Sequence, residues 1–222
     1  MAKKRAAKPA AGESPATEAE IKAEWKVENV VATVVVDLGT AGEKVDLNQI
    51  ARKNSDCEYN PERFPGLIMR LVDPKATILV FSTGKMVVTG LRAADEARAA
   101  VARAIAKMKQ AKVDIKAEPV ITNQNIVASG DLHASIDLNE ASVIMENAMY
   151  EPEVFPGLIY RMAEPKTVFL IFSTGRIVCT GAKTKEIVGE AVEKFVDQVK
   201  EYGIGQAEGE TGSDGNDDAD FI

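Results

Sequence analysis

The residues in this sequence that are suited to contact another molecule occur as pairs of identical motifs. Phe-Pro-Gly-Leu-Ile stands at residues 64–68 and again at 155–159, and Phe-Ser-Thr-Gly stands at 81–84 and again at 172–175. Proline fixes its own backbone φ and restricts the residue before it, so each Phe-Pro pair holds an aromatic ring on a stiff turn. Rigid apolar side chains in matched pairs can act as wedges between stacked base steps. The motifs therefore indicate physical unstacking of bases rather than bond-making chemistry.

These motifs belong to an internal repeat that covers most of the chain. Residues 46–113 align with 137–204 at an offset of 91 without a gap, and 25 of these 68 positions are identical. Upstream, residues 29–32 match 125–128 at an offset of 96, which places five additional residues near 39–44 in the first copy. We therefore expect two copies of one structural unit, related by a pseudo-two-fold axis.

Each copy predicts the same order of elements, β-α-β-β-β-β-α. A β-branched strand (27–36 and 120–129) precedes a short helix, for which Asp46 and Asp137 are the expected N-caps. A brief strand, three further strands and a long helix follow. In the first copy the three strands are expected at 67–71, 77–81 and 86–89 and the helix at 94–111. In the second copy the strands are expected at 158–162, 168–172 and 177–180 and the helix at 185–202. The fold class is α+β, with the strands in one antiparallel sheet and the helices packed on one of its faces.

The expected organisation has four parts. Residues 1–24 are an Ala/Lys/Pro/Glu-rich extension expected to be disordered, 25–115 and 116–204 are the two repeats, and 205–222 are an acidic tail also expected to be disordered. Residues 201–222 carry seven acids and no Lys or Arg, which equals the net charge of −7. The folded part is thus nearly neutral, so binding to nucleic acid must rest on more than general positive charge.

The composition argues against several functional classes. The 222 residues are 45% hydrophobic and 27% charged, as in globular proteins, and no apolar run approaches the roughly 20 residues of a transmembrane helix. Cys57 and Cys179 match no metal or redox spacing, and His133, the single histidine, lacks a partner acid and nucleophile. We expect a cytosolic, non-enzymatic protein that has no metal, no cofactor and no membrane partner.

The face of the predicted sheet that is free of helices is apolar. A sheet face that meets only water should be polar, so an apolar face of this size marks an interaction site. A·T pairs present only acceptors in the minor groove, which Asn and Thr can satisfy, while Val and Leu can pack where no guanine amino group projects. Strand alternation assigns to this face Asn29, Val31, Thr33, Leu79, Phe81, Thr83, Val87 and Thr89 in the first copy, and Asn125, Val127, Leu170, Phe172, Thr174, Val178 and Thr180 in the second.

A tandem, sheet-surface, single-stranded RNA-binding protein is the alternative function. Sheets that expose aromatic side chains can stack unpaired bases, as this face could through Phe81 and Phe172. The alternating Gly and aromatic residues expected in the central strand of that class are missing, and aliphatic residues dominate instead. The alternative predicts that single-stranded RNA competes better than an A·T-rich duplex.

Residues 151–162 and 171–181 resemble the second stirrup and the following hairpin of the TATA-box-binding protein family, and the resemblance extends over about 27–203. Both copies of Phe-Pro-Gly-Leu resemble archaeal members. The resemblance implies a saddle whose curved sheet carries the helices on its convex face. It also implies a general transcription initiation factor that binds the minor groove of TATA promoter DNA, bends it by inserting phenylalanines, and recruits transcription factor B and, indirectly, RNA polymerase. Its location would be the archaeal nucleoid, or the nucleus in a eukaryote.

The resemblance also implies a role for each matched residue. The intercalating residues would be Phe64, Phe81, Phe155 and Phe172. The minor-groove residues would be Asn29, Val31, Leu79, Val87, Thr89, Asn125, Val127, Leu170, Val178 and Thr180. The phosphate contacts would be Arg63, Arg70, Lys85, Arg161 and Arg176. Glu151 and Glu153 match acidic contacts expected for transcription factor B, whereas the first copy has Asn60 and Glu62 there and is less acidic.

Overall fold

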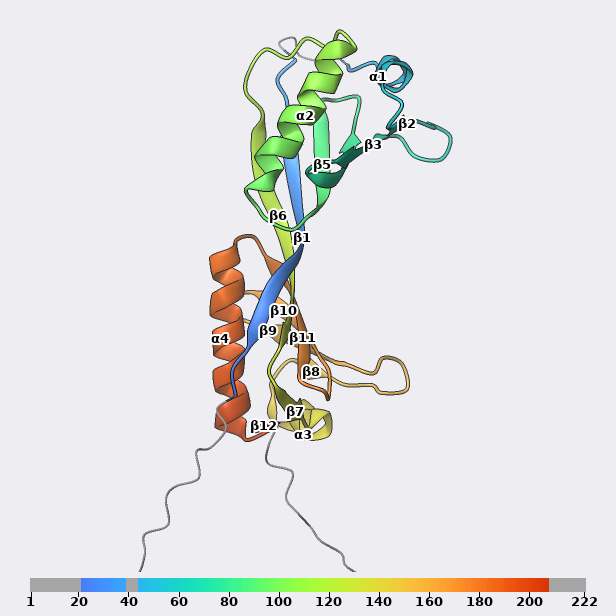
Figure 1. Ribbon diagram of the computed structural model, residues 1–222. Helices are drawn as coiled ribbons and strands as arrows, with labels where there is room; N and C mark the ends of the chain where they lie inside the picture. Colours follow the sequence, from blue (N-terminus) through green and yellow to red (C-terminus); the bar gives the residue numbers. More distant parts are fainter. Residues whose placement is uncertain (1–20, 39–43, 208–222) are drawn as a thin grey trace, which may run out of the picture.

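A computed structural model describes residues 21–38 and 44–207 of the protein (Figure 1). The expectations that concern residues 1–20, 39–43 and 208–222 lie outside these ranges.

The two repeats contain the predicted elements in the predicted order. The first repeat consists of β1 (Glu24–Val35), α1 (Leu47–Lys53), β2 (Cys57–Glu58), β3 (Leu67–Val72), β4 (Lys75–Val80), β5 (Lys85–Leu91) and α2 (Glu96–Gln110). The second consists of β6 (Val120–Asp131), β7 (Ala134–Ile136), α3 (Leu138–Ile144), β8 (Ala148–Met149), β9 (Leu158–Met162), β10 (Thr167–Ile171), β11 (Arg176–Ala182), α4 (Lys185–Tyr202) and β12 (Gly205–Ala207). Strands β7 and β12 are additions that the sequence did not predict.

The strands of both repeats form one continuous antiparallel sheet, in the order β2-β3-β4-β5-β1-β6-β11-β10-β9-β8. At its centre β1 pairs with β6, and Val30 lies opposite Ile126. Asn29 lies opposite Val127, and Val31 lies opposite Asn125, so each pairing repeats the other with the two strands exchanged. The pseudo-two-fold axis therefore passes between β1 and β6, and the α+β fold of two repeats is confirmed.

The long helices cover one face of this sheet. Figure 1 shows α2 and α4 on the same side, while the loops between β2 and β3 and between β8 and β9 project on the other. Along β1, Val30, Ala32 and Val34 are fully buried, whereas the alternate residues are partly exposed. The hydrophobic core thus lies between the sheet and the helices, and the opposite face stays open.

The short helices begin as predicted. The Asp46 carboxylate accepts a hydrogen bond from the N–H of Gln49 (3.1 Å), and the Asp137 carboxylate accepts from Asn139 (2.9 Å) and Glu140 (3.0 Å). Both aspartates satisfy N–H groups that a helix start leaves without intrahelical partners, so both expected N-caps are confirmed. We call the loops 59–66 and 150–157, which follow these helices and their short strands, the first and second stirrups.

In the structure the fold begins before residue 25 and continues past residue 204, the two predicted outer boundaries of the repeats. Gly205–Ala207 form β12 and pair with β7, so the stretch predicted to be disordered from residue 205 is ordered as far as residue 207. Ile21, assigned to the disordered extension, is buried in the core, and a Cβ placed on Gly205 would lie 2.8 Å from its Cδ1. Composition gave no signal for these contacts, because Ile21 is an isolated apolar residue in a polar segment and Gly205–Ala207 contains no β-branched or aromatic residue.

Within residues 21–38 and 44–207, no helix has the length and apolarity to cross a membrane, and no group of His, Cys, Asp or Glu side chains could hold a metal ion. Cys57 and Cys179 are free thiols, and burial raises the pKa of each to about 11. Both thiols are therefore protonated at neutral pH, which favours a packing role over a reactive one.

The two repeats differ in how their cores are filled. In the second repeat Phe169 stacks on Phe195 with ring centroids 5.0 Å apart, and Tyr160 packs against both rings. The equivalent residues of the first repeat, at the offset of 91, are the non-aromatic Ile78, Ala104 and Met69, which are also buried. Stacked rings add to the free energy gained from apolar burial, so the core of the second repeat depends on this aromatic cluster.

Replacing Phe169 by alanine should therefore destabilise the protein strongly. We expect Phe169→Ala to lower the free energy of unfolding by about 3–5 kcal/mol, because it removes a fully buried ring and leaves a cavity. Denaturant unfolding followed by circular dichroism measures the change. Val143→Ala, at an exposed position, is the control and should stay within about 0.5 kcal/mol of wild type. A loss below about 1 kcal/mol for Phe169→Ala would show that the ring is not a central part of the core.

Candidate nucleic-acid interface

Most residues predicted for the open face lie on strands whose alternate residues are buried beneath the helices, but strands β4 and β10 end one residue earlier than expected. The turns that follow them therefore hold Phe81, Thr83, Phe172 and Thr174. Leu79 lies opposite Ile68 on β3 and Val87 on β5, and Thr33 on β1 lies opposite Val87. The second repeat places Leu170 opposite Ile159 and Val178 in the same way. These cross-strand neighbours form continuous rows of partly exposed side chains on each half of the face, and all of them except Thr33 are aliphatic. The face is therefore apolar over both repeats, as the alternation predicted.

Ile68 and Ile159 belong to this surface, although the sequence analysis did not assign them to it. Each is partly exposed and follows a fully buried leucine, Leu67 or Leu158. The signal was present in the repeated Leu-Ile pair, since successive residues of a strand point to opposite faces. Their position beside Leu79 and Leu170, however, follows from the register of β3 with β4 and of β9 with β10.

The four phenylalanines form two aromatic pairs of the same geometry. The ring centroids of Phe64 and Phe81 are 5.9 Å apart with planes at 63°, and those of Phe155 and Phe172 are 5.9 Å apart at 64°. Each ring is partly exposed, so neither pair is part of the buried core. Such edge-to-face contact lets each ring brace its neighbour. The structure thus brings one braced pair of rings to each repeat, where a stirrup approaches the sheet.

A glycine beneath each pair makes this packing possible. A Cβ at Gly66 would lie 2.7 Å from Cε1 of Phe64 and 3.1 Å from Cε1 of Phe81. Gly157 has the same distances to Phe155 and Phe172. Because real Cβ atoms do not approach other atoms to 2.7 Å, any larger residue would displace the rings. The glycine of Phe-Pro-Gly is therefore required by the ring pair.

Two asparagines at the centre of the face are held by equivalent sets of hydrogen bonds, one set in each repeat. Gly90 N–H donates to the Asn29 side-chain oxygen (2.7 Å), and Gly181 N–H donates to that of Asn125 (2.8 Å). Thr89 lies 3.3 Å from the Asn29 oxygen, and Thr180 lies 3.2 Å from the Asn125 oxygen. Because the oxygen of each amide is occupied, its NH2 group is the end available to a ligand, although in Asn125 it also lies 3.0 Å from Thr180 Oγ1.

The predicted phosphate-binding cations are exposed and flank the apolar rows. Arg70 lies opposite Thr77, and Arg161 lies opposite Val168, on the outer strands β3 and β9. Lys85 and Arg176 occupy equivalent starts of β5 and β11, and Arg63 lies in the first stirrup. Arg70 also forms an ion pair of 3.2 Å with Glu58, whereas the residue equivalent to Glu58 in the second repeat is Met149. The two halves thus present similar cations with different acidic neighbours.

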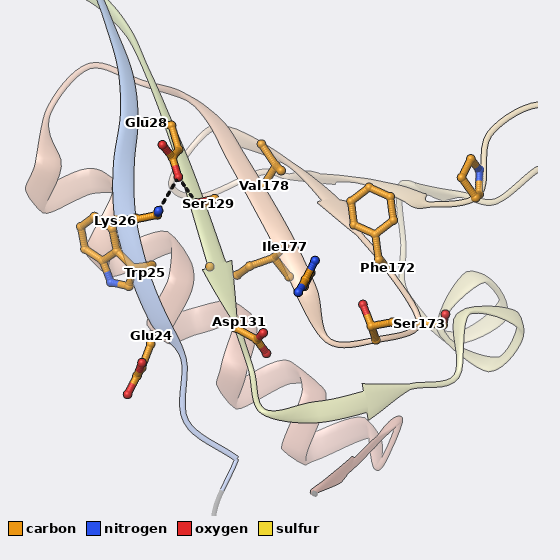
Figure 2. Close-up of a pocket in the computed structure, with 14 residues that line it drawn as sticks. Glu24, Trp25, Lys26, Glu28, Ser129, Asp131, Phe172, Ser173, Ile177 and Val178 are labelled. Atoms are coloured by element: carbon orange, nitrogen blue, oxygen red, sulfur yellow. Dashed lines mark hydrogen bonds and ion pairs between the residues drawn. The ribbon is translucent and has the colours of Figure 1, made fainter. Parts of the chain in front are cut away.

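A hollow of about 1010 Å³ lies on the open face of the second repeat (Figure 2). Phe172 and Val178 line it together with Glu28, Ser129 and Asp131, which the sequence analysis did not assign to the site. Strict alternation would place Glu28 on the helix side, because its neighbour Asn29 faces the open side. An irregularity in the β1–β6 register between Val27 and Asn29 interrupts that alternation.

The outer end of the second repeat carries exposed apolar side chains that the first repeat lacks. Val143 and Val154 are 85% and 80% exposed, and Ile144 and Met149 are also exposed. The four equivalent residues in the first repeat, at the offset of 91, are all charged: Arg52, Arg63, Lys53 and Glu58. Glu151 and Glu153 are exposed in the same region. We call this group of Val143, Ile144, Met149 and Val154 the end patch. The sequence analysis did not assign it, although a position-by-position comparison of the two copies would have found it.

Comparison with known proteins identifies the same two repeats. The sequence model of the family described as "Transcription factor TFIID (or TATA-binding protein, TBP)" matches residues 24–111 and 120–202. The TATA-box-binding proteins of Pyrobaculum aerophilum and Sulfurisphaera tokodaii are each 48% identical to this chain over 180 residues, covering 81% of this chain and 88% of the relative. The solved structure of Methanococcus jannaschii TBP superposes with a TM-score of 0.72 at 40% identity, covering 80% of this chain and 99% of that one.

The hydrogen bonds of the asparagines predict that Asn125→Asp separates folding from ligand binding. The aspartate can still accept from Gly181 and Thr180, so we expect little change in thermal stability. It loses the NH2 donor and adds a negative charge, so affinity for an A·T-rich duplex should fall at least about tenfold. Fluorescence anisotropy and thermal unfolding measure the two quantities. Asn139→Asp, which adds the same charge on α3, is the control; equal affinities of the two variants would exclude a groove-facing amide.

Proposed function

The chain belongs to the TATA-binding protein family, and on that premise we propose that it is a general transcription initiation factor that binds A·T-rich promoter DNA. The observation that carries this proposal is the pair of braced phenylalanines at each half of an apolar, helix-free face. Such a factor acts on the chromosome, so its proposed location in an archaeal cell is the nucleoid. The curated relatives quoted above bear names of TATA-box-binding proteins, which are transcription factors rather than enzymes.

The open face would lie in the minor groove. Aliphatic rows such as Leu79 with Val87 can pack against the groove floor only where no guanine amino group projects, which favours A·T pairs. The NH2 groups of Asn29 and Asn125 lie near the pseudo-two-fold axis, where they can donate to adenine N3 or thymine O2. Sequence preference would then come from groove chemistry and from the ease with which the duplex deforms.

The phenylalanine pairs would bend the duplex. Insertion of an apolar wedge between base steps costs a few kcal/mol per step, and the bent duplex offsets this cost by contacting more protein surface. Phe155 and Phe172 brace each other, and Gly157 lets them pack closely, so the rings lose little further freedom when they insert. The flanking cations Arg63, Arg70, Lys85, Arg161 and Arg176 would contact phosphates on either side of the widened groove.

Transcription factor B would dock at the outer end of the second repeat and recruit RNA polymerase indirectly. The end patch offers apolar contact area, and Glu151 and Glu153 offer a negative rim to a basic partner. Charged residues replace the end patch in the first repeat, so the partner can distinguish the two ends of a nearly symmetric protein. The single-stranded RNA alternative is disfavoured because aliphatic rows cover most of the face and stack poorly on bases.

The wedge role predicts that Phe155→Ala binds duplex but bends it less. The encounter of protein and DNA depends on charge, which this change leaves intact, whereas bending depends on the removed ring. Fluorescence transfer between dyes at the two ends of a TATA duplex measures the bend. Phe64→Ala should have a similar effect, since its pair has the same geometry, and Val154→Ala should bend DNA as wild type does. Full bending by Phe155→Ala would contradict the proposed insertion.

The partner site predicts that Glu151→Arg combined with Glu153→Arg keeps TATA binding and loses the ternary complex with transcription factor B. Reversal of two charges at a docking rim causes like-charge repulsion against a basic partner. Gel-shift titration with purified factor B measures ternary assembly. The control changes the equivalent residues of the first repeat, Asn60→Arg with Glu62→Arg, and should assemble normally. Loss of assembly by the control, or normal assembly by the test variant, would reject the site.

A further inference from the structure

The two halves of the open face differ at one pair of hydrogen-bonded side chains beside the central asparagines. In the second half Glu28 Oε1 lies 2.7 Å from the Ser129 hydroxyl. In the first half Gln124 Nε2 lies 2.8 Å from the Thr33 hydroxyl. At the offset of 96, Glu28 is equivalent to Gln124 and Thr33 to Ser129. The same structural position therefore holds a carboxylate in one half and an amide in the other.

These two hydrogen bonds run in opposite directions. A carboxylate can only accept, so the Ser129 hydroxyl donates the hydrogen bond to Glu28. An amide nitrogen can only donate, so Gln124 donates to Thr33 Oγ1, and the Thr33 O–H is not used in this hydrogen bond. The other possible partner of the Thr33 hydroxyl is the Thr122 carbonyl oxygen, and at 3.5 Å this contact is weak. The first half thus offers the Thr33 hydroxyl as a donor and only the neutral amide oxygen of Gln124 as an acceptor, whereas the second half offers the charged carboxylate of Glu28, which only accepts.

The Glu28 carboxylate is ionised and reachable from the open face. The hydrogen bond from Ser129, followed by contact with Lys26 (3.1 Å), holds its pKa below the ordinary value. The Glu28 side chain is 35% exposed and that of Lys26 is 76% exposed, so the carboxylate is the more recessed of the two. Figure 2 shows Glu28 in the same hollow as Phe172 and Val178, two residues assigned to DNA contact.

The two chemistries suit different base pairs. In the minor groove A·T and T·A pairs present only acceptors, whereas a G·C pair adds the guanine N2 amino group, a donor. We propose that Glu28 and Gln124 make the open face read DNA with a polarity, so that a G·C pair is accepted beneath the second repeat but not beneath the first. Guanine N2 donates to Glu28 there, while Thr33 and Gln124 donate to A·T acceptors in the other half. This inference rests on the proposed minor-groove binding.

An orientation assay tests this polarity. A fluorophore is attached to the second stirrup through Val154→Cys in a Cys57→Ser background, and an acceptor dye is placed at one end of the duplex. Four duplexes are compared: a self-complementary A·T site, the same site with one G·C pair off centre in one half, one with a G·C pair in each half, and one with inosine·C replacing the single G·C. Inosine lacks the N2 amino group, so it isolates the proposed donor.

We expect equal orientations on the A·T site and a bias of about tenfold on the single G·C site, with the G·C pair beneath the second repeat, as for one discriminated base pair. Inosine·C should abolish the bias. Glu28→Gln should also abolish it, and Gln124→Glu should raise the relative affinity for the site with two G·C pairs about tenfold. Glu24→Gln removes an acid from the same hollow that has no bond to Ser129, and it should keep the bias.

The outcomes separate this inference from the proposed function. If the wild type fails to bind the A·T site, both fall. If it binds the A·T site but shows no bias with a G·C pair, or the same bias with inosine·C, the polarity alone is wrong. A bias that persists in Glu28→Gln, with no gain for Gln124→Glu, also overturns it. The reciprocal variants differ from wild type only by an amide in place of a carboxylate or the reverse, and thermal unfolding verifies that each is folded.

Discussion

The antiparallel pairing of β1 with β6 determines the position of every side chain on the open face. Each repeat alone would leave a central strand with unpaired N–H and C=O groups, and joining the two strands satisfies both at once. The register that sets Val30 opposite Ile126 also sets the two asparagines symmetrically about the axis. A slip of one residue would turn the apolar side chains of a strand from one face to the other, so the fold and the binding surface depend on the same register.

The consequence is a protein with two apolar sheet faces but only one set of helices. One face forms the core with α2 and α4, and the other is kept apolar although it contacts only solvent in the isolated protein. Exposed apolar area of this kind is unfavourable in water unless a partner covers it. The rigidity of the sheet, the braced phenylalanine pairs and the anchored amides mean that little rearrangement is needed when the duplex covers it.

Much of the fold and of the candidate site could be predicted because the two repeats of the chain can be aligned with each other. The offset of 91 residues paired Phe64 with Phe155 and Phe81 with Phe172, and alternation placed Leu79 and Leu170 correctly. Alternation failed at Glu28, where the irregular register after Val27 brings a charged residue into the open face. Strand β12 was missed because its three residues, Gly205–Ala207, include no β-branched or aromatic side chain and adjoin an acidic tail. Hydrogen-bond direction at Ser129 and Thr33 depends on contacts across the sheet, which no local pattern encodes.

The anchoring of Ile21 against Gly205 has a practical consequence for how the protein can be handled. The described chain enters and leaves the fold at one extremity, where β12 extends the second repeat beyond α4. A reporter domain or surface tether joined directly at residue 21 or residue 207 would therefore lie at the same extremity, near α3 and β7. The first repeat, at the far end of the long axis, would remain unobstructed. Protein immobilised at residue 21 or residue 207 should accordingly present its two extremities unequally to large molecules, even though its central face is nearly symmetric.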